Sequence, residues 1–501
     1  KAEHAEAVSS CENLPGVWTG FLGTKPLYDE YELVWADAQK LLFSAVVVGG
    51  QTGWTLGQGS LANGNATASI AFDTGVALTG SVSEDCSVLM WSNNSTWKKT
   101  SGIDTVHVVA MNHLDVGYNG IPQLGLVNNI LNRYFSLYFP RAVAISQALR
   151  DLQREEGLVY TTHAWLLHMY MHCPSNYTLS GVLLQCPSAD AVDQMARAIR
   201  RGDVVWHAGA FNTEYENCYD EANVEVQLLW AKLLADEFGV PRPVTVSVRD
   251  VPGITRAVLP TFKRNGVVAV SVGVNNGSPA PAMPNPGVWR DTSTGTDMLY
   301  MQTGQKQGYP NTPGSSPTDP GGMGRDSCVQ WPGLKHVLCW AFRTDNHGPP
   351  ESVEEVIGQF DIARWQFPGA KVVASTFDKF VEHLQSVQAE LPVVTSEVGD
   401  TWITSTTADP TKLKFYRVAA KAYTQCVEQG LCDPRSSDAR LLAFLRQLTK
   451  IPEHTYGVPS IKDTANYTNQ QFQAALLSQQ QPEVDALHSY QEQRDMVMGY
   501  G

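Results

Sequence analysis

The sequence predicts an α/β protein: a parallel β/α domain of seven strands in a barrel-like arrangement, preceded by a small β-rich domain and followed by a helical bundle. Three observations support this class. Residues 1–103 contain short apolar runs between turn residues, residues 104–395 alternate apolar runs with amphipathic stretches, and residues 396–501 contain only helical patterns. Strand–helix alternation with continuously apolar strands is typical of a parallel sheet covered on both faces. A chain of 501 residues is also too long for one ordinary core.

The first domain, residues 1–103, is expected to be a small antiparallel β structure. Gly, Asn and Asp separate its apolar runs, as in hairpin-rich domains. We interpret it as a packing module, with a carbohydrate-binding role as the alternative. The expected strands are Leu41–Val48, Ala68–Phe72, Val76–Leu78 and Val88–Trp91.

The middle domain, residues 104–395, is predicted to hold the parallel sheet. Amphipathic stretches such as Ala189–Arg200, Glu221–Glu237 and Val353–Trp365 separate the strands and predict covering helices. The segment Asn275–Gly333 is rich in Gly, Pro, Ser and Thr, which predicts a long insertion near the mouth of a site. The expected strands are Thr105–Met111, Leu158–Thr162, Val204–His207, Val244–Val248, Val267–Val272, His336–Phe342 and Lys371–Ser375.

The last domain, residues 396–501, is predicted to be a bundle of three helices. Their expected ranges are Lys412–Gln429, Ser437–Lys450 and Asn469–Met496. This bundle is expected to contribute to the active site.

Charge and hydropathy exclude two classes of partner. The formal net charge is -14 and the sequence contains no Lys/Arg-rich run, so a nucleic-acid partner is not expected. No apolar stretch reaches the length that spans a bilayer, so no membrane span is expected.

Cysteines and glycosylation motifs favour the secretory pathway. None of the nine cysteines forms a CxxC pair, which disfavours a zinc ribbon or a thioredoxin motif. The chain begins at Lys1, which predicts that an N-terminal signal segment was removed. The expected disulfides are Cys11–Cys86, Cys173–Cys186, Cys328–Cys339 and Cys426–Cys432, with Cys218 unpaired. The Asn-X-Ser/Thr motifs lie at Asn65, Asn93, Asn94, Asn176, Asn276 and Asn466.

The strongest local signal for chemistry is the pair His113 and Asp115, directly after the strand Thr105–Met111. Residues i and i+2 of an extended segment point to the same side. The pair is therefore expected at the carboxyl edge of the parallel sheet, where this class of fold binds ligands. The alternative is a hydrogen-bonded turn without a ligand.

Two later segments carry similar groups. Asp250 ends the strand Val244–Val248 and precedes a helical pattern, so it is either a ligand or a helix cap. His454 lies on a turn after the second bundle helix, where a lone histidine is more often a polar packing residue.

In chain order, these segments resemble glycoside hydrolase family 38, the α-mannosidases. The family's HxDxGW motif ends the first strand of its β/α domain, and His113–Tyr118 reads HLDVGY here. Its Asp-Pro-Phe-Gly segment resembles Arg249–Gly253 loosely, and the following Leu259–Gly266 also matches the family. Its His-His-Asp-Ala turn resembles Glu453–Gly457. The stretch Ala198–Asn223 resembles the segment upstream, and the likeness spans residues 104–480.

The resemblance implies a metal centre and a mechanism. The ligands are then His113, Asp115, Asp250 and His454, a two-His, two-carboxylate set that suits one Zn²⁺ ion. Asp250 would also be the nucleophile of a retaining α-glycosidase. Tyr118, in place of the family's Trp, would stack on the sugar.

The acid/base departs from the family pattern. The family carries its acid in a Gly-Asp-Asp-Phe segment, whereas the matching stretch, Cys339–Arg343, contains no carboxylate. The nearest replacement is Asp345, with His347 beside it as a substrate contact. The alternative for Asp345 is a turn residue or a helix cap.

Further side chains after strands are candidates for substrate contacts. His163 and Trp165 follow the strand Leu158–Thr162, and Glu214 follows the strand Val204–His207. Glu214 is equally well explained as a loop carboxylate. His168 and His172 share the i, i+4 spacing of a metal pair, but a packed helix face explains them better.

Three functions follow, in order of preference. The first is a secreted, metal-dependent retaining α-glycosidase, similar to α-mannosidases and acting on glycans. The second is an inactive relative that serves an extracellular assembly as a structural or carbohydrate-binding component, with further chains or a cleaved C-terminal part as partners. The third is a metal-dependent polysaccharide deacetylase, which His168 and His172 favour but the absence of an Asp-Asp pair disfavours.

Overall fold

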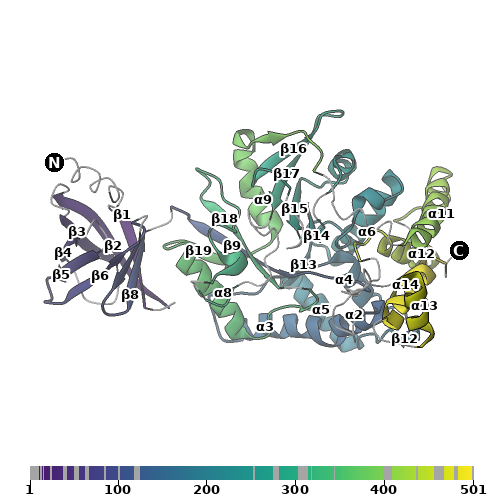
Figure 1. The fold of residues 1–501 in the computed structure, drawn as a ribbon, viewed down its shortest axis with the longest axis horizontal. Helices are drawn as coiled ribbons and strands as arrows, with labels where there is room; N and C mark the ends of the chain where they lie inside the picture. Colours follow the sequence, from purple (N-terminus) through teal and green to yellow (C-terminus); the bar gives the residue numbers. More distant parts are fainter. Residues whose placement is uncertain are drawn as a thin grey trace.

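The computed structural model has three parts, which Figure 1 shows in chain order from a β-barrel at one end to helices at the other. The strands and helices of the middle part lie between them. Lys98 of the barrel links the first two parts, because its Nζ donates to the backbone oxygen of Trp365, 3.0 Å away. The described residues are 11, 14, 16–22, 25–37, 42–49, 56–62, 67–83, 86–99, 102–117, 125–251, 254–274, 281–302, 314–316, 319–343, 345–398, 409–435, 438–455, 468–478 and 483–498.

The first part is a closed antiparallel barrel, which agrees with the predicted antiparallel β structure. Strand β1 pairs with both β2 and β8, and this double pairing closes the sheet. Trp97 and Tyr31 stack inside it with ring centroids 3.8 Å apart. The strands are β1 (Gly16–Leu22), β2 (Lys25–Asp37), β3 (Leu42–Gly49), β4 (Leu56–Ala62), β5 (Thr67–Phe72), β6 (Ala77–Val82), β7 (Val88–Trp91) and β8 (Ser95–Lys99).

All seven parallel strands expected in the middle part are present, but they do not close a seven-stranded barrel. Five of them form one sheet with the order β13-β10-β9-β18 plus β19 beside β9. The other two, β14 and β15, join three further strands in a second sheet with the order β14-β15-β17-β16-β20. The predicted seven-stranded barrel is therefore not confirmed. The strands are β9 (Thr105–Asn112), β10 (Tyr160–Thr162), β11 (Thr178–Leu179), β12 (Val182–Leu183), β13 (Val204–Trp206), β14 (Thr245–Asp250), β15 (Ala269–Val274), β16 (Gly287–Asp291), β17 (Thr296–Gln302), β18 (His336–Arg343), β19 (Lys371–Ala374) and β20 (Val393–Val394).

The segment Asn275–Gly333, expected to be an irregular insertion, contributes two strands to the second sheet. Strand β17 pairs in parallel with β15, and β16 pairs with β17 in the antiparallel direction. The expectation was wrong for these strands because β16 contains only two large apolar residues, the adjacent Val288 and Trp289, and they do not stand out in a Gly- and Pro-rich segment. Strand β17 therefore occupies the edge of β15 where the next strand of a closed barrel would pair.

Short polar contacts join the two sheets where β13 and β14 meet. The amide of Ala208 donates to the carbonyl of Thr245, 2.8 Å away. Further along, the hydrogen bond comes from a side chain instead of the backbone. The Oδ1 atom of Asn212 accepts from the amide of Arg249 at 2.9 Å. The loop after β13 is thus bonded to β14 without a continuous strand ladder.

Helices cover the sheets and begin at side chains that accept hydrogen bonds from their first turns. Ser188, Asp220, Ser352 and Thr376 cap α5, α6, α8 and α9 in this way. The helices of this part are α2 (Val127–Arg133), η4 (Tyr134–Tyr138), α3 (Phe139–Asp151), α4 (Ala164–Met171), α5 (Ala189–Arg201), η5 (Tyr215–Asn217), α6 (Glu221–Phe238), η6 (Arg256–Val258), α7 (Leu259–Arg264), η7 (Gly321–Met323), α8 (Val353–Gln366), α9 (Phe377–Leu384) and η8 (Gln385–Glu390).

The last part has four described helices where the sequence predicted three. They are α11 (Pro410–Glu428), α12 (Ala439–Lys450), α13 (Asn469–Leu477) and α14 (Glu483–Met498). The expected helix Asn469–Met496 is divided, and Pro482 lies in the sequence between its two halves. A proline inside a helix removes a backbone donor and clashes with the preceding turn, which explains the division.

Helix α14 docks on the loop after β9. Ser489 donates its hydroxyl to the carbonyl of Gly117, 2.8 Å away, and Glu492 accepts from the amide of Val127 at 2.9 Å. Gly117 has φ of +86°, and a β-carbon there would lie 2.9 Å from the side chain of Gln493. Glycine is therefore required at this position both by conformation and by space.

The structure contains the four disulfides that the sequence predicted, and Cys218 is the free cysteine among the described residues. Asn93, Asn94 and Asn176 are exposed on turns, where glycosylation would be sterically open. Asn65, Asn276 and Asn466 lie outside the described residues. Within the described chain, no helix combines the length and the hydropathy of a membrane span.

We predict that Glu492 makes the stability of the folded chain depend on pH. Burial raises the pKa of this carboxyl from 4.5 to about 7 in the folded state. The folded state therefore holds the proton more tightly than the unfolded state does, and stability decreases as the pH rises from 4.5 through 7. Glu492→Gln removes this loss, so the variant should be more stable at pH 8 by roughly 3 kcal/mol, with little difference at pH 4.5.

Chemical denaturation of both proteins at the two pH values measures this effect. The exposed Glu390→Gln serves as the control and should shift neither curve. An equal gain for Glu492→Gln at both pH values would contradict the predicted role of its ionisation.

Candidate metal centre

His113 and Asp115 lie just beyond the carboxyl end of β9, as predicted. The strand is buried along almost its whole length, and its pairing continues one step further because the amide of His113 donates to the carbonyl of Arg343 at 3.2 Å. The extended backbone turns both side chains to the same side. They meet there, with Nε2 of His113 2.9 Å from Oδ1 of Asp115.

Asp250 is the last residue of β14 and has an unusual backbone conformation. Its φ of +74° lies in the left-handed region, which costs free energy for a residue with a side chain. The preceding Arg249 is buried, with its guanidinium carbon 4.1 Å from the ring centre of Phe342. On its other side a β-carbon on Gly273 would lie only 2.6 Å from that guanidinium carbon, so only glycine fits. Arg249 thus fixes the end of β14, and Asp250 turns away from it.

His454 reaches the same place from the turn after α12. Its amide donates to the carbonyl of Asn212 at 2.9 Å. Its Nδ1 lies 2.8 Å from Oε1 of Glu453, and Glu453 in turn pairs with Nζ of Lys450 at 2.9 Å. A carboxylate at one ring nitrogen of a histidine orients the other nitrogen toward a ligand. This arrangement leaves Nε2 of His454 facing Asp115 and Asp250.

The four side chains converge on one point. Nε2 of His454 lies 3.0 Å from Oδ1 of Asp115, 3.3 Å from Oδ2 of Asp250 and 3.2 Å from Nε2 of His113. Nε2 of His113 lies 3.9 Å from Oδ2 of Asp250. Tetrahedral ligands that are 2.0–2.2 Å from a cation are about 3.4 Å apart, so this set fits a small divalent cation.

Exposure distinguishes the four groups. The side chains of His113, Asp115 and His454 are 1%, 4% and 1% exposed, whereas that of Asp250 is 10% exposed. Asp250 is therefore the member of the set that a small molecule reaches most easily.

The charges of the four groups depend on one another. Burial by itself lowers the pKa of His113, but the carboxylates of Asp115, Asp250 and Asp345 raise it above its ordinary value. Burial opposes ionisation of Asp115, yet His113 and His454 lower its pKa. The carboxylates consequently stay ionised, which is the state that holds a cation.

Asn212 connects all three segments that carry these groups. Its Oδ1 accepts from the amide of Arg249 at 2.9 Å, and its Nδ2 donates to the carbonyl of Leu114 at 2.9 Å. Its carbonyl accepts from the amide of His454, and its Nδ2 lies 3.1 Å from Nδ1 of His113. The side chain is fully buried, so each of these bonds replaces a lost bond to water.

Asn346 holds the loop after β9 from the other side. Its Oδ1 accepts from the amide of Asp115 and its Nδ2 donates to the carbonyl of the same residue, both at 3.1 Å. Its own amide donates to the carbonyl of His113 at 2.9 Å. Asn346 has φ of +48°, which places it in a tight turn after β18.

The sequence did not identify Asn212, Asn346 or Glu453 as part of the centre. Asn346 follows Asp345 in a polar turn, and a turn asparagine has no signature that separates a clamp from an ordinary bend. The position of Glu453 beside His454 was a usable signal, because histidine ligands commonly pair with a neighbouring carboxylate. Asn212 lies on an irregular loop, and only its hydrogen bonds to Leu114 after β9 and to Arg249 of β14 reveal its role.

The residues predicted to contact substrate occupy different surroundings. His163 is buried with Nδ1 3.0 Å from Nε2 of His207, and Trp165 is buried with its indole nitrogen donating to the carbonyl of Arg446. Glu214 is buried and accepts from the side chain of Asn217. Asp345 and His347 are exposed on the loop that Asn346 anchors, and Tyr118 lies outside the described residues.

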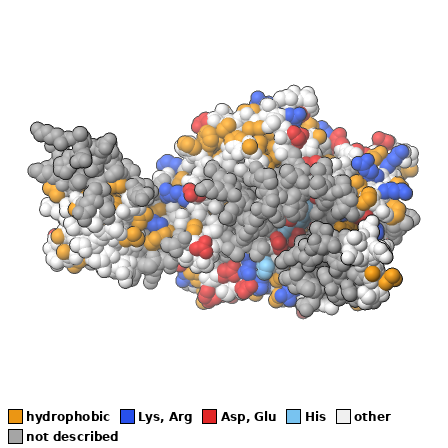
Figure 2. Space-filling view, in the orientation of Figure 1, with side chains coloured by type: hydrophobic (Ala, Val, Ile, Leu, Met, Phe, Trp, Pro, Cys, Tyr) orange, Lys and Arg blue, Asp and Glu red, His pale blue; other side chains and the backbone are white. Residues whose placement is uncertain are grey.

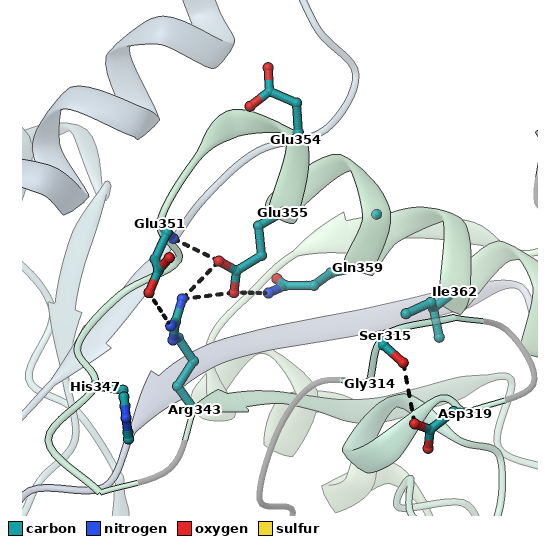
Figure 3. A pocket seen from close by; sticks show the side chains of 11 residues that line it. Gly314, Ser315, Asp319, Arg343, His347, Glu351, Glu354, Glu355, Gln359 and Ile362 are labelled. Carbon is teal, nitrogen blue, oxygen red and sulfur yellow. Dashed lines mark hydrogen bonds and ion pairs between the residues drawn. The ribbon is translucent and has the colours of Figure 1, made fainter.

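A cavity of about 590 Å³ opens beside this loop. Arg343 and His347 line one side of it, and Figure 3 shows Arg343 paired with both Glu351 and Glu355. Arg343 is also the last residue of β18, and its carbonyl accepts a hydrogen bond from the amide of His113. Arg343 therefore lines the cavity with its side chain and supports the segment of His113 with its backbone.

His168 and His172 do not belong to a metal group among the described residues. His168 is buried, and burial lowers its pKa well below the usual range. Nε2 of His172 pairs with Glu237 at 2.8 Å. The packed helix face therefore explains them better than a metal pair does.

Known proteins provide little further information about this site. A family model described as a domain of unknown function, DUF5054, matches residues 406–499, a range that includes His454. No curated protein matches the chain.

Several solved structures are similar at low identity. They include a 4-α-glucanotransferase from Thermococcus litoralis (10% identity, TM-score 0.41, 69% of this chain and 53% of that chain). They also include an α-mannosidase from Enterococcus faecalis (13%, 0.44, 79% and 43%) and a GH57 branching enzyme from Thermococcus kodakaraensis (11%, 0.43, 79% and 89%). The chain spans about half the length of the first two. Because these TM-scores are below 0.5, we infer neither fold nor function from the likeness.

We predict that Asn212→Ala weakens the centre as well as the fold. The change leaves the amide of Arg249 and the carbonyl of Leu114 buried without partners, which costs roughly 2–4 kcal/mol of stability. The side-chain bonds to Arg249, Leu114 and His113 are lost, while the backbone bond to His454 remains. Affinity for a divalent cation, with Zn²⁺ as the probe, should therefore decrease roughly tenfold. Denaturation and calorimetric titration with Zn²⁺ measure the two effects.

Asn223→Ala provides a matched control for this prediction. Asn223 is equally buried and hydrogen-bonded, but its partners are Asp220 and Thr424 on the far helices. The control should lose stability and keep its affinity for Zn²⁺. Equal affinities for Asn212→Ala and the unchanged protein would contradict the role assigned to Asn212.

Proposed function

We propose that this protein is a secreted, zinc-dependent retaining α-glycosidase, similar to α-mannosidases, that acts on glycans. The observation that carries the proposal is the convergence of His113, Asp115, Asp250 and His454 at the carboxyl edge of the parallel strands. Parallel sheets bind their ligands at this edge. Asp250, the more accessible carboxylate of the set, faces outward from it.

The donor set favours zinc over the harder cations. Two imidazoles and two carboxylates match the nitrogen and oxygen ligands that Zn²⁺ accepts, whereas Ca²⁺ and Mg²⁺ prefer oxygen ligands alone. A bound Zn²⁺ would orient neighbouring hydroxyls of a mannose-like ring and stabilise negative charge on them. Glu453 and Asn212 support the arrangement by fixing His454 and His113.

Asp250 is assigned the role of nucleophile. In the first step its carboxylate oxygen forms a bond to the anomeric carbon while the bond from that carbon to the leaving oxygen breaks. His113 and His454 lower the pKa of Asp250 against the effect of burial, so the carboxylate is ionised and ready to attack. The strained φ of Asp250 fixes the direction of the side chain before substrate binds.

Asp345 is assigned the role of acid and base. Its carboxyl group would donate a proton to the leaving oxygen in the first step and then accept one from the water that releases the sugar from Asp250. Asp345 lies on the same loop as Asn346, which bonds to both neighbours of Leu114. This anchoring keeps the exposed Asp345 near the centre, and its charge contributes to the raised pKa of His113.

The remaining glycan is assigned to the cavity beside the loop. Its volume of about 590 Å³ falls in the range of pockets that bind small molecules. His347 lines it and would contact the glycan. Tyr118 is also assigned a contact with the sugar, from its place in the sequence directly after Gly117. The buried His163, Trp165 and Glu214 are assigned to support of the centre, because a buried side chain that bonds to its neighbours offers little to a sugar.

The disulfides predicted from the sequence support secretion. Four disulfides persist in oxidising compartments and are rare in the cytosol. On the face that Figure 2 shows, several Lys and Arg side chains lie together at the right-hand end, but the formal net charge of -14 opposes binding of the chain to nucleic acid.

We predict that Asp250→Asn abolishes hydrolysis of p-nitrophenyl α-mannoside. The amide keeps the size of the side chain but is a poor nucleophile, so turnover should decrease on the order of a thousandfold. Removal of metal with a chelator should also abolish turnover, and Zn²⁺ should restore it. Release of p-nitrophenol measures both effects.

Asp203→Asn is the matched control, because Asp203 is a buried aspartate at the opposite end of the parallel strands. It should retain turnover if it folds. An unchanged protein that hydrolyses no aryl α-glycoside with any added metal would contradict the enzyme and favour the alternative, an inactive relative that binds carbohydrate.

We predict that Asp345→Asn is rescued by azide. The loss of a general base slows the release of the sugar, so turnover of the same aryl substrate should decrease about a hundredfold. Azide needs no general base, so it should restore turnover and yield an α-glycosyl azide. Asp319→Asn, an exposed aspartate that also lines the cavity, is the control and should show no azide effect. The acid/base assignment is wrong if azide leaves the rate of Asp345→Asn unchanged.

A further inference from the structure

Three histidines come together away from the centre described above. His107 lies on β9, His336 begins β18, and His383 is near the end of α9. One ring nitrogen from each lies within 4.8 Å of the others. His107 is buried and the other two are partly exposed, so the group opens to solvent on one side.

The backbone explains why these residues meet. Strands β9 and β18 are parallel neighbours in which His336 pairs with Thr105 and Leu338 with His107, which places the two imidazoles on adjacent strands. Helix α9 packs over the same face, since Phe380, Val381 and Leu384 share an apolar cluster with Val109 and Leu338. His383 therefore projects from the helix toward the strand pair, and its ring stacks on that of His336 with centroids 3.5 Å apart. One of these two rings would have to rotate for both to point a nitrogen at the same cation, because the lone pairs lie in the ring planes.

His107 has the surroundings of a metal-binding histidine. Its Nδ1 lies 2.8 Å from the hydroxyl oxygen of Ser375, and the amide of Ser375 is fixed by the carbonyl of Val108 at 2.9 Å. A partner at one ring nitrogen fixes the ring and leaves the other nitrogen as the ligand. Nε2 of His107 lies 3.0 Å from Nδ1 of His336, close to the separation of two ligands on one cation.

The charge state of the rings suits a transition metal. Burial, together with the neighbouring His336 and His383, lowers the pKa of His107 to about 4. The pKa of His336 is lowered too, by burial and by His383. The rings of His107 and His336 are therefore neutral at neutral pH, with a lone pair available on each. Lys379 is an exposed residue one turn before His383 on α9, and its positive charge disfavours a cation here. The negative charge of Asp104 favours one.

We propose that His107, His336 and His383 form a second metal site, for a divalent cation that prefers imidazole, such as Zn²⁺. Water would complete the coordination on the exposed side. The six residues from His107 to His113 span about 20 Å of extended chain, so this site lies at the other end of the parallel strands and does not share ligands with the first centre. Its role is structural, because the cation links β9, β18 and α9.

The experiment titrates the metal-free full chain with Zn²⁺ by calorimetry and with Co²⁺ by visible absorption. The double variant His336→Ala/His383→Ala should bind one equivalent fewer than the unchanged protein. It should also lose the part of the Zn²⁺-dependent increase in Tm that the second ion causes. Both substituted residues are partly exposed, and hydrolysis of the aryl substrate should stay as in the unchanged protein.

Two further variants sharpen the test. His488→Ala removes an exposed histidine elsewhere and should leave the stoichiometry unchanged. Lys379→Ala removes the opposing charge and should tighten Zn²⁺ binding at this site roughly threefold.

The stoichiometry separates this proposal from the first centre. A loss of one equivalent in the double variant supports the second site even if the first centre binds no metal. Equal stoichiometry and an equal Tm increase in the unchanged protein and the double variant would overturn it, and the three rings would then be a hydrogen-bonded and stacked cluster only.

Discussion

Asn212 bonds to the backbone next to each of the groups that the centre brings together. Its side-chain oxygen accepts a hydrogen bond from the amide of Arg249, beside Asp250. Its side-chain nitrogen donates to the carbonyl of Leu114, between His113 and Asp115. Its backbone carbonyl accepts from the amide of His454. The segments come from two sheets and from the helical part, so no strand ladder positions them relative to one another. The side-chain amide and the backbone carbonyl of this one buried residue thus supply the geometry that secondary structure cannot supply here.

This arrangement also makes the helical part necessary for the centre. His454 is oriented by Glu453 and Lys450, and Lys450 shares Oε1 of Gln493 with the buried Lys412. Helix α14 holds the loop after β9 through Ser489 and Gly117. Charges buried this deeply are tolerated only with partners. The same contacts that compensate them fix the position of His454.

The parallel strands carry polar groups at both of their ends, with different consequences. At the carboxyl end, two carboxylates accompany two imidazoles and one carboxylate remains accessible, which suits chemistry on a substrate. At the amino end, three imidazoles without a carboxylate among them link β9, β18 and α9. Ligand type and exposure are therefore the reasons why the site at the carboxyl end is assigned a catalytic role and the site at the amino end a structural role.

The sequence by itself determined the seven parallel strands expected in the middle part, the antiparallel first part, the cysteine pairs and the pair His113 and Asp115, whereas Asp250 and His454 were nominated as ligands through the family resemblance. Apolar periodicity, loop-closing spacings and the i, i+2 relation of His113 and Asp115 are local, so they can be read along the chain. The tertiary structure alone decided that the sheets do not close a seven-stranded barrel, because β17 from Asn275–Gly333 pairs with β15. It also decided the roles of Asn212, Asn346 and the group around His107. These depend on contacts between residues far apart in the sequence, such as His107 and Ser375, and no local pattern encodes such contacts.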